Sequence, residues 1–263
     1  VPYLSFKALD DTGLAVNGFS TRMGGASRGK FSTMNFSYSR GDAAEDVLEN
    51  FTRMAAALGV ERDRMVVSHQ THTVNLRRVT LEDAGKGVIR ERDYRDIDGL
   101  ITDVPGLTLV TFYADCVPLY LLDPVNRAIG LSHSGWRGTV KRMGQVMVDA
   151  MKEAFGTKPE DLIACVGPSI CRDCFEVGGE VVEEFREAFG PEHREALYCQ
   201  GKRPGKYQLD LWKANEIIFR EAGICRENIH ITNICTMCNS DYLFSHRKVG
   251  EERGNLAAFL CLK

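Results

Sequence analysis

The chain has 263 residues, of which 44% are hydrophobic and 26% charged, and its 33 basic and 36 acidic side chains leave a formal net charge of −3. This composition is that of an ordinary globular protein with a sizeable core. There is no basic surplus to indicate a nucleic-acid partner, and no apolar run reaches the roughly 18 residues of a membrane span. The first residues lack the basic and apolar regions of a signal peptide, so we expect a cytoplasmic protein without a membrane partner.

The chain contains nine cysteines but only six histidines. Without a secretory signal, we expect these cysteines to be free thiols or metal ligands rather than disulfides. The scarcity of histidine restricts the metal sites that the chain can build.

We find no internal repeat, low-complexity segment or linker, and we therefore expect one domain over residues 1–263. In chain order the sequence predicts a strand entering a glycine turn (15–25), a helix after Asp42, a strand-like segment (65–79), two strands (107–123), a strand (127–136), a helix from Gly138, a strand (162–170), helices (178–189 and 209–222) and strands (229–235 and 255–262). This mixed order favours a layered α/β or α+β fold over a regular doubly wound sheet.

The helix after Asp42 shows the clearest periodicity. Val47, Phe51 and Met54 recur at helical spacing, and Gly59 follows the last apolar residue. We expect Asp42 to cap this helix at its start and Gly59 to end it.

Three polar clusters interrupt apolar strands: SHQTH at 68–72, ADC at 114–116 and SHSGWRG at 132–138. Burying an unpaired polar group costs on the order of a few kcal/mol, so each interruption needs a reason. Local satisfaction by the backbone is one explanation, and convergence on a shared site is the other. A turn at 123–127 would fold two strands together and bring Cys116 and His133 side by side.

A converged site of this kind is open to three interpretations. Two histidines and one cysteine suit zinc, and three protein ligands leave a fourth position for water or substrate. The same ligands suit a blue-copper site, but a multicopper oxidase needs many more imidazoles than six histidines supply. A metal-free nucleophile and base, Cys116 with His133, is the third interpretation, and it leaves SHQTH without a role.

Two further motifs are more ambiguous. Arg22 beside Gly24 and Gly25 in STRMGGAS would suit an anion such as phosphate, although a plain turn is the better explanation from this motif alone. CRDC (171–174) and CTMC (235–238) have the spacing of metal-binding or redox pairs, whereas packing of small side chains is the simpler explanation.

Motifs along nearly the whole chain resemble the YfiH/YlmD-type family, also called laccase-domain or polyphenol-oxidase-like. The matching segments are FSTRMGGAS (19–27), MNFSYSRGDAAEDVLENF (34–51), SHQTHTV (68–74), DIDGLIT (96–102), YADCVPLYLLD (113–123), GLSHSGWRGT (130–139), VGPSICRDCFEVG (166–178), LDL (209–211), NICTMC (233–238) and LFSHR (243–247). The resemblance implies a single-domain layered α/β/β/α sandwich, similar to the catalytic domain of cytotoxic necrotising factor.

The resemblance also implies an enzyme of purine nucleosides and phosphate. It implies phosphorolysis of adenosine, inosine, guanosine and methylthioadenosine, and deamination of adenosine to inosine. The implied zinc ligands, carried over by motif, are His72, Cys116 and His133. Thr73 stands where the family usually has glycine.

Phosphorolysis requires a group that holds the phosphate dianion, and arginine is suited to that role. Arg22, Arg137 and Arg247 are the candidates for phosphate binding. Asp115, next to Cys116, is a candidate for moving protons, because a break in the strand could turn it inward.

Overall fold

The computed structural model describes all 263 residues, which form eight α-helices and fourteen strands. The helices are α1 (Lys7–Asp10), α2 (Ala44–Leu58), α3 (Trp136–Val140), α4 (Met143–Phe155), α5 (Gly179–Phe189), α6 (Arg194–Leu197), α7 (Leu211–Glu221) and α8 (His246–Val249). The strands are β1 (Tyr3–Leu4), β2 (Ala15–Ser20), β3 (Met65–Val67), β4 (Leu76–Arg78), β5 (Gly99–Thr102), β6 (Thr108–Tyr113), β7 (Val117–Asp123), β8 (Ala128–Ser134), β9 (Ile163–Val166), β10 (Glu176–Gly178), β11 (Tyr198–Gln200), β12 (Lys206–Leu209), β13 (Ile229–Ile231) and β14 (Leu256–Leu262). No helix has the length and apolar character needed to cross a membrane.

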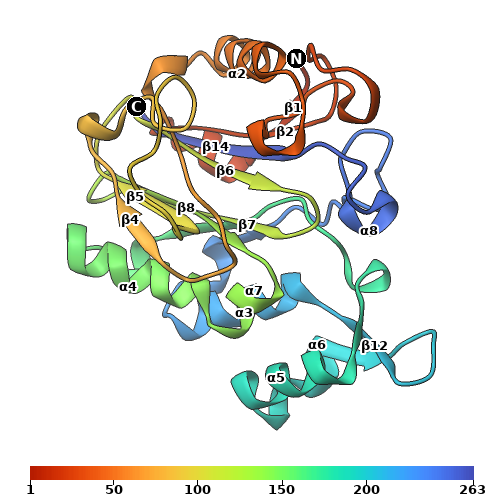
Figure 1. The fold of residues 1–263 in the computed structure, drawn as a ribbon. Coiled ribbons are helices and arrows are strands. Elements are labelled where there is room, and N and C mark those ends of the chain that lie inside the picture. Colours follow the sequence, from red (N-terminus) through yellow and green to blue (C-terminus); the bar gives the residue numbers. More distant parts are fainter.

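Two large sheets stack between helices. One has the strand order β1-β2-β14-β6-β3, and the other has the order β13-β9-β7-β8-β5-β4. Helix α2 lies over the outer face of the first sheet, and α3, α4 and α7 lie over the outer face of the second (Figure 1). The predicted α/β/β/α layering is therefore confirmed.

Strand β7 shows why the layers hold together. Leu119 and Leu121 pack in the core cluster that includes helices α4 and α7. Tyr120 and Leu122 point the other way, into the cluster between the two sheets. Alternate side chains of a strand face opposite sides of its sheet, so a strand buried on both faces is apolar throughout. A third cluster, which includes Phe51 of α2, fills the space between that helix and the first sheet.

A third, small sheet projects to one side of the layers. It has the order β10-β12-β11 and lies with α5 and α6 away from the two large sheets (Figure 1). The sequence predicted α5 but none of these three strands, because each has only three or four residues and too few positions to show an alternating pattern.

The predicted end of helix α2 is confirmed, but its predicted cap is wrong. Gly59 ends the helix in the left-handed conformation, with φ of 69°. Asp42, however, is not the cap: Ala43 occupies that position, and no side chain caps the helix. The Asp42 carboxylate instead accepts hydrogen bonds from the N–H of Ala43 and the side-chain amide of Asn35.

The helix expected from Gly138 differs from the structure in two respects. It begins earlier, at Trp136, and is divided into α3 and α4 by Arg142, whose φ is 60°. The guanidinium of Arg142 pairs with Glu221 on α7, so the break accompanies a contact between helices that the local sequence does not reveal.

The segment 65–79 likewise forms two strands rather than one. Strand β3 belongs to the first large sheet and β4 to the second. The polar segment SHQTH lies in the loop that crosses between the sheets.

The predicted hairpin is confirmed. Strands β7 and β8 pair antiparallel, with Pro118 opposite His133 and Asp123 opposite Ala128. Because Val117 pairs with Ser134, Cys116 lies just before one strand and Gly135 just after the other, at the same end of the hairpin.

Candidate metal centre and its cavity

His72, Cys116 and His133 converge at one point. One potential ligand atom from each lies within 4.8 Å of the other two. His72 comes from the loop between β3 and β4, Cys116 from the turn between β6 and β7, and His133 from the end of β8. His133 is buried, Cys116 is half-buried and His72 is exposed, so the group is open on one side.

Asp98 orients two members of this group. Its buried carboxylate lies 2.8 Å from Nδ1 of His133. It also accepts the backbone N–H groups of Thr71, His72 and Thr73, at 2.9, 3.1 and 3.0 Å. With Nδ1 held by a carboxylate, Nε2 is the nitrogen of His133 that is available to a metal.

The same contacts fix the loop that carries His72. This residue has a φ of 65°, a conformation uncommon outside glycine. The three N–H groups that converge on Asp98 account for the geometry. The Thr73 hydroxyl donates a fourth hydrogen bond to Asp98, at 3.1 Å, so the residue that departs from the family motif supports the same carboxylate.

Gly135 leaves the space in which the three side chains meet. A Cβ at this position would lie 3.0 Å from Sγ of Cys116 and 3.1 Å from Cδ2 of His72. Both distances are tighter than ordinary van der Waals contact, so any side chain would displace the two groups. The soft N and S donors, and the open space beside them, fit a zinc or copper ion.

The electrostatics of the group favour the thiolate form of Cys116. Burial opposes ionisation of Cys116, but His133 and His72 outweigh it and lower its pKa to about 6. Burial works against a charged His133, yet Cys116 and Asp98 raise its pKa to about 9. The pKa of Asp98 is lowered as well, because its bonds to His133, Thr71 and Thr73 outweigh its burial. The site therefore stabilises a thiolate beside positive charge.

A cavity of about 570 Å³ opens above these three residues. Residues distant in sequence form its wall, and it includes the aromatic side chains of Tyr38, Phe112 and Tyr113. The groups in the wall that can move protons, other than the three convergent residues, include His69, His246 and Glu251.

Three arginines line the cavity: Arg40, Arg92 and Arg253. Arg40 and Arg253 both donate to the same oxygen, Oδ1 of Asn255. The Arg253 side chain is buried, and its Nε has no hydrogen-bond partner. Burial, followed by the charge of Arg40, lowers the pKa of Arg253 to about 10. Two guanidinium groups that share one acceptor favour a nearby anion, and the carboxylate of Glu251 already lies 2.7 Å from Arg40.

The residues predicted to bind phosphate lie elsewhere. Arg22 donates to the carbonyls of Ser32 and Ser240 and lies over the ring of Phe244. Arg247 donates to the carbonyls of Cys174 and Glu176. Arg22 and Arg247 are thus engaged by the backbone, and neither lines the cavity.

Arg137 and Asp115 also lie outside the cavity wall. Arg137 is exposed and lies over the ring of Trp136. Asp115 does turn inward, with φ of 87°, but its carboxylate accepts the Thr236 hydroxyl and the N–H of Arg247, both at 2.6 Å. It holds two loops together beside Cys116.

Sequence reasoning missed Asp98 and the cavity arginines. For Asp98 a signal existed: an acidic residue comes directly before GLIT, the wholly buried strand β5. For Arg40 and Arg253 there was none, because their neighbourhood depends on contacts across more than two hundred residues.

The chain is similar to a known protein family, to characterised relatives and to a solved structure. The model of a family described as multi-copper polyphenol oxidoreductase laccase matches residues 16–263. The purine nucleoside phosphorylase YlmD of Geobacillus stearothermophilus is 34% identical over 94% of this chain and 89% of that protein. The adenosine deaminase RL5 of an unknown prokaryotic organism is 34% identical over 91% of each chain. The crystal structure of the Bacillus licheniformis hypothetical protein YfiH superposes with a TM-score of 0.90 at 32% identity, covering 95% of this chain and 93% of that one.

Proposed function

We propose that this chain, which belongs to the family described as multi-copper polyphenol oxidoreductase laccase, is a zinc-dependent purine nucleoside enzyme. It phosphorolyses adenosine, inosine, guanosine or methylthioadenosine, and it also deaminates adenosine to inosine. Relatives named as purine nucleoside phosphorylase and as adenosine deaminase, each 34% identical, support both activities.

The observation that carries the proposal is the convergence of His72, Cys116 and His133 at a cavity of about 570 Å³. Clefts of roughly 300 to 1,000 Å³ accommodate small organic ligands, and a nucleoside is one of these. Mixed sulfur and nitrogen donors suit zinc, and three protein ligands are typical of catalytic rather than structural zinc.

The metal, held by His72, Cys116 and His133, supplies a Lewis acid at the reacting centre. The other residues position groups around it. Asp98 holds the ring of His133, and the aromatic side chains of the wall offer faces on which a purine base can stack.

Phosphate binding is the role that we assign to Arg40 and Arg253. Both residues line the cavity, and the planar guanidinium group of arginine is suited to hydrogen-bonding the oxygens of a phosphate. The sequence-based prediction assigns this role to Arg22, Arg137 and Arg247 instead.

The two assignments make opposite predictions for one experiment. We expect Arg253→Gln to raise the KM for phosphate at least tenfold and to leave adenosine deamination within about threefold, because only phosphorolysis needs the anion. Arg22→Gln, the matched control, should change neither. The measurement is the initial rate of both reactions against phosphate concentration. A phosphate defect in Arg22→Gln alone would favour the assignment made from sequence.

The overall activity is tested by the products formed from adenosine. With phosphate, the proposal predicts adenine and ribose 1-phosphate; without phosphate, it predicts inosine. Protein of known metal content that yields none of these products would contradict the proposal.

A second candidate, a metal-free cysteine hydrolase, is favoured by one observation. Cys116, His133 and Asp98 lie in the order of a nucleophile, its base and an orienting carboxylate. In that case Cys116→Ser would abolish turnover and leave the metal content of the protein unchanged. The zinc proposal predicts instead that metal and turnover are lost together.

A copper-dependent phenol oxidase is the alternative that the family description suggests. Metal analysis of protein purified without added copper separates it from the zinc enzyme. A phenol oxidase would contain copper and consume oxygen with a phenolic substrate.

A further inference from the structure

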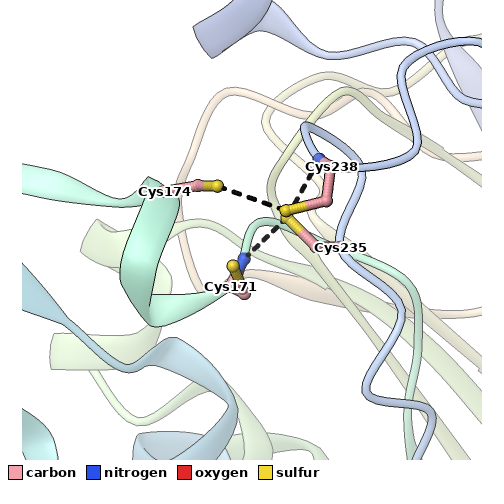
Figure 2. A group of neighbouring side chains, drawn as sticks. All are labelled: Cys171, Cys174, Cys235 and Cys238. Atoms are coloured by element: carbon pink, nitrogen blue, oxygen red, sulfur yellow. Dashed lines mark hydrogen bonds between the residues drawn. The ribbon is translucent and has the colours of Figure 1, made fainter.

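Four cysteines gather at a second place, outside the cavity. Cys171 and Cys174 flank a 3₁₀ turn that leads into the small sheet, and Cys235 and Cys238 lie in the segment between β13 and α8. Their sulfur atoms all lie within 4.8 Å of one another (Figure 2). None of the four is in a disulfide.

The spacing is that of a tetrahedral metal site. Zinc bound by thiolates has Zn–S distances of about 2.3 Å, which places the corners of the tetrahedron about 3.8 Å apart. The sulfur atoms of Cys174 and Cys238 are 3.5 Å apart, and the remaining pairs stay below 4.8 Å. A disulfide would need one pair at about 2.05 Å.

Hydrogen bonds to the sulfur of Cys235 also indicate a metal site. Sγ of Cys235 accepts the backbone N–H of Cys171 at 3.3 Å and that of Cys238 at 3.4 Å (Figure 2). An N–H group aimed at sulfur stabilises the thiolate form, which is the form that binds a metal.

Simple packing of small side chains does not account for the cluster. Cys235 is buried, but Cys171 and Cys174 are half-buried and Cys238 is exposed. The cluster is therefore open to solvent on the side of Cys238.

We propose that Cys171, Cys174, Cys235 and Cys238 bind one structural zinc ion. Four thiolates exclude hard cations such as Mg²⁺ and Ca²⁺, which take oxygen ligands. They also complete a tetrahedron, and a site without an open position is structural rather than catalytic.

The ion joins two segments 64 residues apart in the chain. Closing a long loop lowers the entropy of the unfolded chain and so stabilises the folded one. The four-cysteine site is also connected to the cavity. Thr236, between Cys235 and Cys238, donates a hydrogen bond to Asp115, which is adjacent to Cys116. Arg247 adds a second link, since it donates to the carbonyl of Cys174 and to Asp115.

The first test counts zinc in a variant without the cavity ligands. We expect Cys116→Ala/His133→Ala protein to retain one zinc per chain. Adding Cys174→Ser and Cys238→Ser should remove it, whereas adding Cys225→Ser, a half-buried cysteine outside both groups, should not. Cobalt in place of zinc should produce intense thiolate-to-metal absorption only when all four cysteines are present. None of these readouts requires turnover, so the result does not depend on the proposed function.

The second test uses the wild-type chain and needs no variant to fold. An alkylating reagent followed by mass spectrometry should modify Cys225 at the same rate with and without a chelator, and should modify Cys174 and Cys238 only after chelation. Equal rates in both conditions, or zinc-free protein with a Cys174–Cys238 disulfide, would overturn the proposal. Iron at this site would overturn its assignment to zinc.

Discussion

At the scale of single residues, the centre depends on a side chain that would not itself bind the metal. Asp98 holds the ring of His133 and three consecutive N–H groups of the loop that carries His72. One carboxylate thereby sets the positions of two of the three convergent side chains. Groups in such supporting positions typically contribute a factor of about 10 to 100 in metal affinity or activity.

We predict that Asp98→Asn lowers zinc affinity at the cavity centre about 10- to 100-fold, with a matching loss of activity. In the wild type, five groups donate to the two carboxylate oxygens of Asp98. The amide of the variant has only one oxygen that can accept these hydrogen bonds. The measurement is a competitive zinc titration of the variant, with thermal unfolding as the control for folding. Wild-type affinity in a folded variant would show that Asp98 has no part in the site.

At the scale of elements, the β7–β8 hairpin brings together what the sequence separates. Its register places Cys116 beside Gly135 and next to His133. This much was predictable, because two apolar strands, a turn and a glycine are local signals. The break at Arg142 between α3 and α4 was not predictable, since it accompanies an ion pair between Arg142 and Glu221, which lies 79 positions away.

Gly135→Ala tests the close approach at the end of this hairpin. The new Cβ would lie about 3 Å from Cys116 and His72, so we expect loss of the cavity metal and of activity in a variant that still folds. Gly138→Ala is a matched control on helix α3, because its Cβ would meet no atom closer than 3.6 Å. The two variants should differ in zinc content by direct metal analysis. Equal zinc content in both would contradict the account of Gly135.

The segment between β4 and β5 is held by a different carboxylate, Asp83. It is nearly buried and bonds to Lys86, Arg77 and the N–H of Thr80. Burial opposes its ionisation, but these three partners outweigh it and lower its pKa below the ordinary value. A lowered pKa means that the stabilisation is complete above about pH 4, the unfolded value, and is lost as the pH falls through the folded one.

Asp83→Asn should therefore cost about 2 kcal/mol of unfolding free energy near pH 7, and the difference from wild type should shrink below about pH 4. Asp103→Asn, which breaks the exposed pair with Arg78, serves as the control and should change little. Denaturant unfolding at several pH values measures both. A difference that is constant with pH would show that the charge of Asp83 is not the stabilising element.

At the scale of the whole molecule, the cavity forms where loops of both sheets meet. Its wall includes residues 37–40, 67–70 and 112–114, the three convergent side chains, and His246, Glu251, Arg253 and Asn255 from the segment before β14. The layers and the convergence of His72, Cys116 and His133 were predictable, because each follows from a local pattern or a motif. The arginine pair was not: Arg40 and Arg253 carry no local signal and become neighbours only through the packing of distant segments.

We propose that purine nucleoside turnover requires a metal held by His72, Cys116 and His133. The most direct measurement is the rate of adenosine phosphorolysis by chelated protein before and after stoichiometric zinc is restored, beside folded Cys116→Ser protein treated in the same way. We expect chelation to abolish turnover, and we expect zinc to restore turnover in the wild type but not in the variant. Full turnover by metal-free wild-type protein would contradict it.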